Sequence, residues 1–357
     1  MTNTLYFLAL NRIEGIGPRT VSKLLARWPC LEELFGLSCE AMQKAKVSEL
    51  VARAISTFDL SQVEADWRWQ ETKRHHILTW EDEAYPALLK EIHDPPPVLY
   101  AMGDITALQQ PTVAMVGTRH PSVTGSETAW RFASELARHG ITIVSGLALG
   151  IDAQSHRGCL EAQGQTIAVM GTGIDTIYPK RHQALAEKIT EKGLLLSQFP
   201  LKSPPIAGHF PLRNRIISGL SLCILVVEAA IKSGSLITAR LALEQNRDVL
   251  AIPGSIYNQQ TKGCHYLLQQ GAKLVTSSHD VLDELGINTE SVASRPQLLP
   301  AIDNSTLLKF IGYDVTTIDE IINRSGLSID KVVCDLADLE LQRRVQAVPG
   351  GYLRCTI

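Results

Sequence analysis

Several features that mark other classes of protein are absent from this sequence. No segment approaches the ~20 consecutive apolar residues that cross a bilayer. The stretch MTNTLYFLALNRIEG at the N-terminus is briefly apolar, but it has neither a basic n-region nor a small-residue cleavage site. The seven cysteines form no CxxC pair and show no zinc-type spacing with histidine. We therefore expect a soluble cytoplasmic protein without a bound metal or a membrane partner.

A strong excess of positive charge is also absent. Lysine and arginine number 34 and aspartate and glutamate 37, which gives a formal net charge of −3. Proteins that bind nucleic acid are often strongly basic, so this balance counts mildly against such a partner. It leaves room for a local basic patch, because the field in a cleft is set by the charges nearby.

The common nucleotide-binding and catalytic motifs are missing as well. The sequence contains no GxGxxG loop after a strand and no GxxxxGK[ST] element, which disfavours a dinucleotide cofactor and a P-loop NTPase. No Ser-His-Asp set and no pair of carboxylates stands out at the predicted site. We therefore expect a binding protein that is not an enzyme and has no cofactor.

The 357 residues, 45% of them apolar, are enough for two or three domains with substantial cores. Residues 1–84 are predicted to form a helical N-terminal domain. Its stretch IEGIGPRTVSKLLARW resembles half of a helix-hairpin-helix element, in which glycine amides meet a phosphate. The alternative, which we favour, is a tight turn between two packed helices. Residues 85–104 contain three consecutive prolines, which predict an extended connector to the next strand.

The segment 85–286 is predicted to be a doubly wound α/β domain. Its short apolar runs are continuous rather than alternating, as in a parallel sheet covered on both faces, and helical stretches lie between most of them. Ligands of such sheets bind at the carboxyl ends of the strands. The expected strands cover 113–116, 141–145, 166–170, 193–197, 223–228, 249–253 and 273–276.

Residues 287–303 are predicted to be a linker, and residues 304–357 a winged-helix domain. Two helices joined at Gly326 precede a two-stranded wing around Pro349–Gly351. The expected recognition helix, 328–342, carries four acidic residues and one lysine, which would repel DNA phosphates. A protein contact or a structural role is therefore favoured over DNA binding.

The loops at the predicted strand ends offer repeated anion sites. In VAMVGTRHPSVTG, Gly117 stands where a dinucleotide loop has its first glycine, but Arg119 replaces the second. Arginine suits a phosphodiester because its planar fork donates two hydrogen bonds at once. Of Arg213 and Arg215, at most one is expected to face the cleft. Such a row of sites predicts a single-stranded polynucleotide as the ligand, and the candidate residues are Gly117, Arg119, Ser145, Gly146, Lys180, Phe210, Arg213, Asn214, Ser233 and Gly234.

Seven ordered motifs between about Tyr85 and Leu285 closely resemble the DNA-processing protein A (DprA, or Smf) family. They include VAMVGTRHPSVTG, IVSGLALGIDAQSHRGCL, IAVMGTGIDTIYPKRH, HFPLRNRIISGLS and EAAIKSGSLITARLA. The resemblance implies a homodimer with a Rossmann-like core that protects incoming single-stranded DNA during natural transformation and loads the recombinase RecA. It implies DNA contacts by Arg119, Lys180, Phe210 and Arg213, with Gly117, Ser145, Gly146, Ser233 and Gly234 lining the pocket.

The alternative function is that of a nucleotide-processing enzyme related to the phosphoribohydrolases. Those enzymes carry a PGGxGT loop and a catalytic Glu-Arg arrangement. The comparable stretch here, EAAIKSGSLITA, has Ser233-Gly234-Ser235 in place of paired glycines. This difference favours phosphate binding without hydrolysis.

Overall fold

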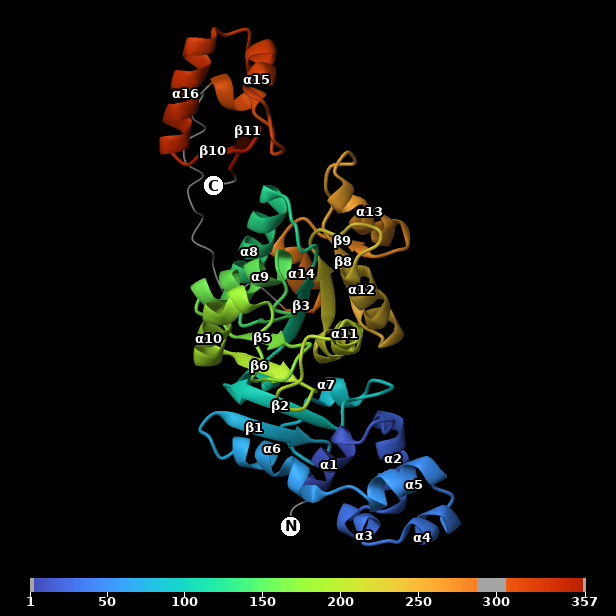
Figure 1. The fold of residues 1–357 in the computed structure, drawn as a ribbon. Coiled ribbons are helices and arrows are strands. Elements are labelled where there is room, and N and C mark those ends of the chain that lie inside the picture. The colour runs from blue at the N-terminus through green and yellow to red at the C-terminus, as the bar shows by residue number, and fades with distance from the viewer. Residues whose placement is uncertain (1–2, 288–305, 356–357) are drawn as a thin grey trace. The chain divides into compact units, whose positions relative to one another are not determined.

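The computed structural model describes residues 3–287 and 306–355, which belong to two compact units (Figure 1). The first unit extends to residue 288 and the second begins at residue 289. The linker predicted for residues 287–303 lies, apart from Ile287, outside the described residues. Within the two described ranges, no helix combines the length and the apolarity needed to cross a membrane.

The first unit is built on a nine-stranded sheet in the order β1-β2-β6-β5-β4-β3-β7-β8-β9. Strands β3 to β9 pair in parallel, whereas β1 and β2 are antiparallel additions beside β6. This confirms the predicted Rossmann-like, mainly parallel sheet. The strands are β1 (His75–Thr79), β2 (Val98–Gly103), β3 (Thr112–Val116), β4 (Thr142–Ser145), β5 (Thr166–Val169), β6 (Leu194–Ser197), β7 (Cys223–Val226), β8 (Asp248–Ala251) and β9 (Lys273–Leu274).

Helices cover both faces of the sheet, which explains why its central strands are apolar throughout. In β3, Val113 and Met115 pack into the core of one face, and Ala114 and Val116 into that of the other. The first face carries α8 (Val123–Arg138), α9 (Ile151–Glu161), α10 (Gln183–Lys192) and α14 (Ser278–Glu284). The second carries α7 (Ala87–Lys90), α11 (His209–Leu220), α12 (Gly234–Glu244) and α13 (Lys262–Gln269). Short 3₁₀ helices cover Leu60–Val63 (η1), Ile105–Gln109 (η2), Lys180–His182 (η3) and Gln259–Thr261 (η4).

The N-terminal helices share a hydrophobic core with this sheet. Phe7 and Leu10 belong to the same cluster as Tyr100 of β2 and Leu195 of β6. The sheet therefore starts inside the segment predicted to be helical, at β1, and β2 occupies part of the predicted connector. The helices are α1 (Asn3–Arg12), α2 (Pro18–Arg27), α3 (Leu31–Phe35), α4 (Cys39–Lys44), α5 (Glu49–Ser56) and α6 (Glu64–Trp69).

A buried carboxylate joins three of these elements. Asp66 of α6 is fully buried and pairs with Arg12 of α1 through two hydrogen bonds, of 2.8 and 3.0 Å. The hydroxyl of Tyr100 on β2 donates to the same carboxylate at 2.8 Å. Each partner is needed because an unpaired charge in the core is costly.

The second unit has the predicted winged-helix arrangement. It comprises η5 (Thr306–Phe310), α15 (Ile318–Ser325), α16 (Ile329–Leu341), β10 (Val345–Val348) and β11 (Gly351–Arg354). Gly326 ends α15 with a positive φ of 68°, a conformation that glycine adopts without strain, and so permits the turn into α16. The two strands pair antiparallel to form the wing.

Substitution of Arg12 by alanine should lower the free energy of unfolding of the first unit by about 3 kcal/mol, because Asp66 would keep its charge without its main partner. Tryptophan fluorescence during urea unfolding measures this directly, since all five tryptophans lie in that unit. The matched control is Arg68→Ala on α6, whose exposed pair with Glu64 should contribute only about 0.3–0.5 kcal/mol. Equal losses in the two variants would contradict the role given to Asp66.

Candidate nucleic-acid interface

A cavity lies at the carboxyl ends of β3 and β7, where the order of the strands reverses. The chain leaves β3 for α8 on one face and leaves β7 for α12 on the other, which opens a crevice between the two loops. The cavity has a volume of about 340 Å³. Seven of the predicted residues line it: Gly117, Arg119, Phe210, Arg213, Asn214, Ser233 and Gly234.

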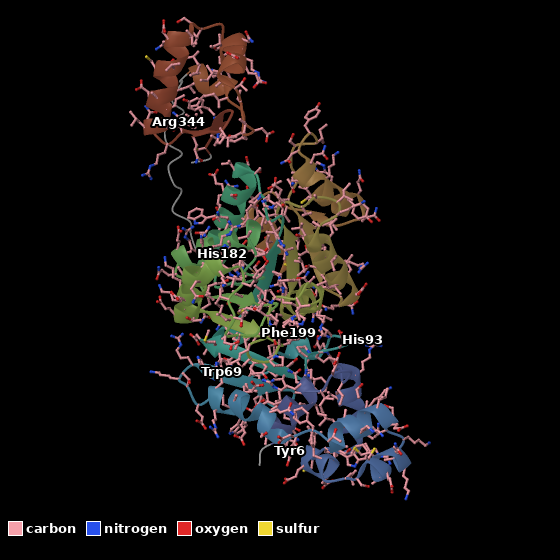
Figure 2. All side chains as sticks on the ribbon, viewed as in Figure 1. Tyr6, Trp69, His93, His182, Phe199 and Arg344 are labelled. Carbon is pink, nitrogen blue, oxygen red and sulfur yellow. The ribbon has the colours of Figure 1, made fainter. Side chains whose placement is uncertain are left out.

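An exposed cation and an aromatic ring stand together in this lining. Arg119 follows β3 and is solvent-exposed, with its guanidinium carbon 5.9 Å from the centroid of the Phe210 ring. Phe210 is half-buried in the first turn of α11. The start of that helix is held by His209, whose ring stacks on that of Phe199 with 4.0 Å between the ring centroids (Figure 2 labels Phe199). The pair offers a charge for a phosphate and a ring face for a base.

The N-terminus of α12 lines the cavity and is suited to an anion. Ser233 is the N-cap residue, but its side chain does not cap the helix, and its buried Oγ has no partner among the described residues. Gly234 and Ser235 begin the helix, where amide groups and the helix dipole favour a negative charge. Lys232 lines the same side of the cavity. This arrangement suits one phosphate group.

Arg213 is buried in the wall of the cavity. It lines the cavity, yet it is only 5% exposed, and its Nη1 donates to the carbonyls of Gly146, at 2.5 Å, and Val169. Burial lowers its pKa to about 10, so the group stays charged at neutral pH. Nη1 thus serves two strand ends, and the contact of Arg213 with DNA stays a prediction. Of the two arginines, at most one was expected to face the cleft. Arg215 forms an ion pair with Asp94 instead.

Ser145 and Gly146 lie behind the cavity and not in its lining, which corrects the prediction for both. The hydroxyl of Ser145 is buried and donates to the carbonyl of Met115 at 2.6 Å. A Cβ atom at position 146 would lie 2.6 Å from Nη2 of Arg213, so glycine is required for the arginine to fit. Asp152 accepts from the amides of Gly146 and Ala148, and its pKa is raised by burial.

Lys180 lies outside the cavity, in the exposed 3₁₀ turn η3. This turn is anchored by His182, whose Nδ1 is 2.9 Å from the carbonyl of Leu147 (Figure 2). The ring of Tyr178, two residues before Lys180, lies 5.8 Å from that of Phe210. Lys180 is therefore connected to the cavity by neighbouring aromatic rings rather than by direct contact.

Glu228 is a residue of this site that the sequence analysis missed. It directly follows the buried run of β7, and it accepts hydrogen bonds of 2.9 Å from the amide of Ser122 and from the side chain of Asn258. Its carboxylate thus holds the loop that carries Arg119. Gly125, the second glycine of the VAMVGTRHPSVTG motif, makes room for this carboxylate and leaves no space for a phosphate. A charged residue directly after an apolar strand was the available signal.

Substitution of Gly125 by alanine should destabilise the first unit, because the new Cβ would lie 2.1 Å from Oε2 of Glu228. We expect a loss of about 1–3 kcal/mol, typical of overpacking. Gly208→Ala is the control: a Cβ there meets nothing within 4 Å, and the change should stay within about 0.5 kcal/mol. Urea unfolding followed by tryptophan fluorescence compares the two, and an unchanged midpoint for Gly125→Ala would refute the packing argument.

A buried histidine on α9 is expected to make the stability depend on pH. Nδ1 of His156 lies 2.7 Å from Oγ1 of Thr166, which itself donates to the carbonyl of Ile143, so Nδ1 carries the proton. Nε2 is buried and has no partner within the described chain. Burial first, and the charges of His182 and Arg213 second, lower the pKa of His156 to about 3. The folded protein therefore keeps this ring neutral.

The free energy of unfolding should fall as the pH drops from about 6.5 towards 3, because the unfolded chain then binds a proton that the folded His156 refuses. The contribution of one such group is at most about 1.4 kcal/mol per pH unit. In His156→Asn, urea unfolding over this range should show a shallower slope than in the original protein. Identical slopes would mean that another group causes the acid sensitivity.

Comparison with known proteins agrees with this fold. Residues 76–286 match the family described as DNA recombination-mediator protein A, and residues 292–351 match the DprA winged helix domain. Protein Smf of Escherichia coli is 41% identical over 322 residues, which cover 88% of this chain and 86% of Smf.

Two solved structures are also similar. The X-ray structure of DNA processing protein A from Streptococcus pneumoniae has a TM-score of 0.68 at 36% identity, covering 80% of this chain and 98% of that one. The Helicobacter pylori protein, described for its single-stranded DNA binding mode, has a TM-score of 0.53 at 33% identity, covering 59% and 95%. With its sheet, its winged helix and these matches, the chain belongs to the DprA/Smf family.

Proposed function

We propose that this protein binds single-stranded DNA in the cavity between the ends of β3 and β7. One phosphate binds at the N-terminus of α12, beside Ser233 and Lys232, and a base stacks on Phe210. Arg119, exposed on the opposite loop, binds a neighbouring phosphate. Gly117, Asn214 and Gly234 shape the lining.

The observation that carries this proposal is the unpartnered hydroxyl of Ser233 at an uncapped helix start. A buried polar atom without a partner is costly unless a ligand supplies one. The exposed Arg119 and the ring of Phe210 extend the site beyond a single anion. The Helicobacter pylori relative, whose description names single-stranded DNA, supports the choice of polymer.

We further propose that the protein shields the strand in the cytosol, acts as a homodimer and loads RecA in transformation or recombination. Membership of the DprA/Smf family supports this assignment. Faster assembly of RecA on a strand coated with single-strand-binding protein is the measurement that separates loading from binding alone.

The winged helix contributes through protein contacts in this proposal. The only lysine of α16, Lys331, is paired with Asp335 at 2.8 Å, so the helix offers no unpaired cation to a DNA groove. Ile329 and Val333, one turn apart on the same helix, are exposed apolar residues. Such a surface suits a protein better than a polyanion.

An enzyme of the phosphoribohydrolase type is the alternative, and the carboxylates near the cavity argue against it. Asp152 is held by two backbone amides, and Glu228 by one amide and by Asn258. Both groups are thus engaged in positioning loops. Release of base from a nucleoside monophosphate would overturn this assignment.

Substitution of Arg119 by alanine should weaken single-strand binding roughly tenfold for all base sequences and reduce the salt slope by about 0.7, the value for one phosphate contact. Fluorescence anisotropy over a salt series, with single- and double-stranded DNA compared, gives both quantities. The control, Arg53→Ala, removes one exposed charge on α5, far from Arg119 in the sequence. It should leave the affinity and the salt slope unchanged. Full-strength binding by Arg119→Ala with an unaltered salt slope would refute the proposal.

A further inference from the structure

A second basic hollow lies between α9 and α10, outside the cavity described above. This α9–α10 groove has a volume of about 580 Å³. Four cationic side chains and two carboxylates line it. The charged lining residues are Arg157, Arg181, Lys188 and Lys192, together with Glu161 and Glu191.

The cations of the groove are not neutralised by those carboxylates. Glu161 stands four residues after Arg157 on α9, yet it accepts a hydrogen bond of 3.1 Å from the indole of Trp130. Lys192 donates to the side-chain oxygen of Gln163, a neutral group. Within residues 3–287 and 306–355, none of the four cations takes part in an ion pair. Their charge is therefore available to a ligand.

Helix α10 places two of the groove's cations on one face. Lys188 and Lys192 are four residues apart and so lie on the same side of the helix. Both side chains are exposed and both line the groove, together with one carboxylate of the same helix, Glu191. The two lysines therefore offer neighbouring positive charges to one ligand.

The groove continues from the cavity through a row of adjacent side chains. Arg119 is near the Phe210 ring, and that ring is 5.8 Å from Tyr178. Lys180 follows Tyr178 after one proline, and Arg181, the next residue, lines the groove. Two consecutive exposed cations, Lys180 and Arg181, thus lie between the aromatic rings at the cavity and the groove.

We propose that the α9–α10 groove binds the phosphodiester backbone of the same single strand where it leaves the cavity. This inference rests on the proposed function and adds the path of the strand. Helix α10, with ten residues, is about 15 Å long, which matches about four phosphates at the stacked spacing of about 3.4 Å. The exposed cations at the groove bind phosphates and read no bases.

The test compares two lengths of oligothymidine, one of about five nucleotides, which the cavity alone accommodates, and one of about twenty, which reaches the groove. In the double variant Lys188→Ala/Lys192→Ala, affinity for the long oligonucleotide should fall roughly tenfold, with a salt slope smaller by about 1.4. Affinity for the short oligonucleotide should stay unchanged. The charge-matched control is Lys44→Ala/Arg53→Ala, two exposed cations on α4 and α5.

The outcomes distinguish this inference from the function on which it rests. If the original protein binds both oligonucleotides and the double variant has the same affinity at both lengths, DNA binding by the groove is refuted. The proposal of DNA binding in the cavity is then unaffected. If the original protein binds neither, the proposed function itself fails. Equal losses of affinity at both lengths would also refute the groove as an exit path. An unchanged melting temperature of the variant shows that its fold is intact.

Discussion

Nη1 of Arg213 donates to the carbonyls of Gly146 and Val169, just where β4 and β5 end, and the rest of the site depends on this contact. It ties the N-terminal part of α11 to the sheet, and so it sets the position of Phe210 three residues earlier. Only glycine at position 146 leaves room for the guanidinium group. A displaced guanidinium would lose the hydrogen bonds of Nε and Nη1 while still buried, which is costly, so these bonds fix its position. The buried side of the cavity is therefore held in place, while Arg119 is exposed and can contact a ligand.

The distribution of charge explains how a chain with a net charge of −3 can bind a polyanion. The second unit places four acidic residues on α16. The first unit exposes Arg119, Lys180 and Lys232 near the strand ends and four further cations along the α9–α10 groove. Screening limits each charge to its surroundings, about 8–10 Å at ordinary salt, so the local sign matters more than the total.

The central strands were predictable because each is buried on both faces and reads as an uninterrupted apolar run. Strands β1 and β2 were not, since His75 and His76 open β1 with polar residues and the prolines before β2 obscure it. Strand β1 pairs only with β2, and β2 joins the rest of the sheet through β6, across more than ninety residues. For the site, Arg119 and Ser233 were predictable from their places after strands. The burial of Arg213 and Ser145 was not, because it depends on packing between α11, β4 and β3.

Which loops carry residues suited to anions and which fold class the chain adopts follow from the sequence alone, because hydrophobic periodicity and turn residues are local properties. The number of compact units does not, because the N-terminal helices share a hydrophobic core with the sheet. The tertiary structure alone decided which of those groups face a common cavity and which support it. In the folded chain, Arg213 fits against Gly146 and supports the cavity from below its lining, and Glu228 holds the loop that carries Arg119. Helices α9 and α10 lie side by side and form the basic groove. These roles arise from contacts between residues distant in the chain, and no local pattern records which of two polar groups will be buried.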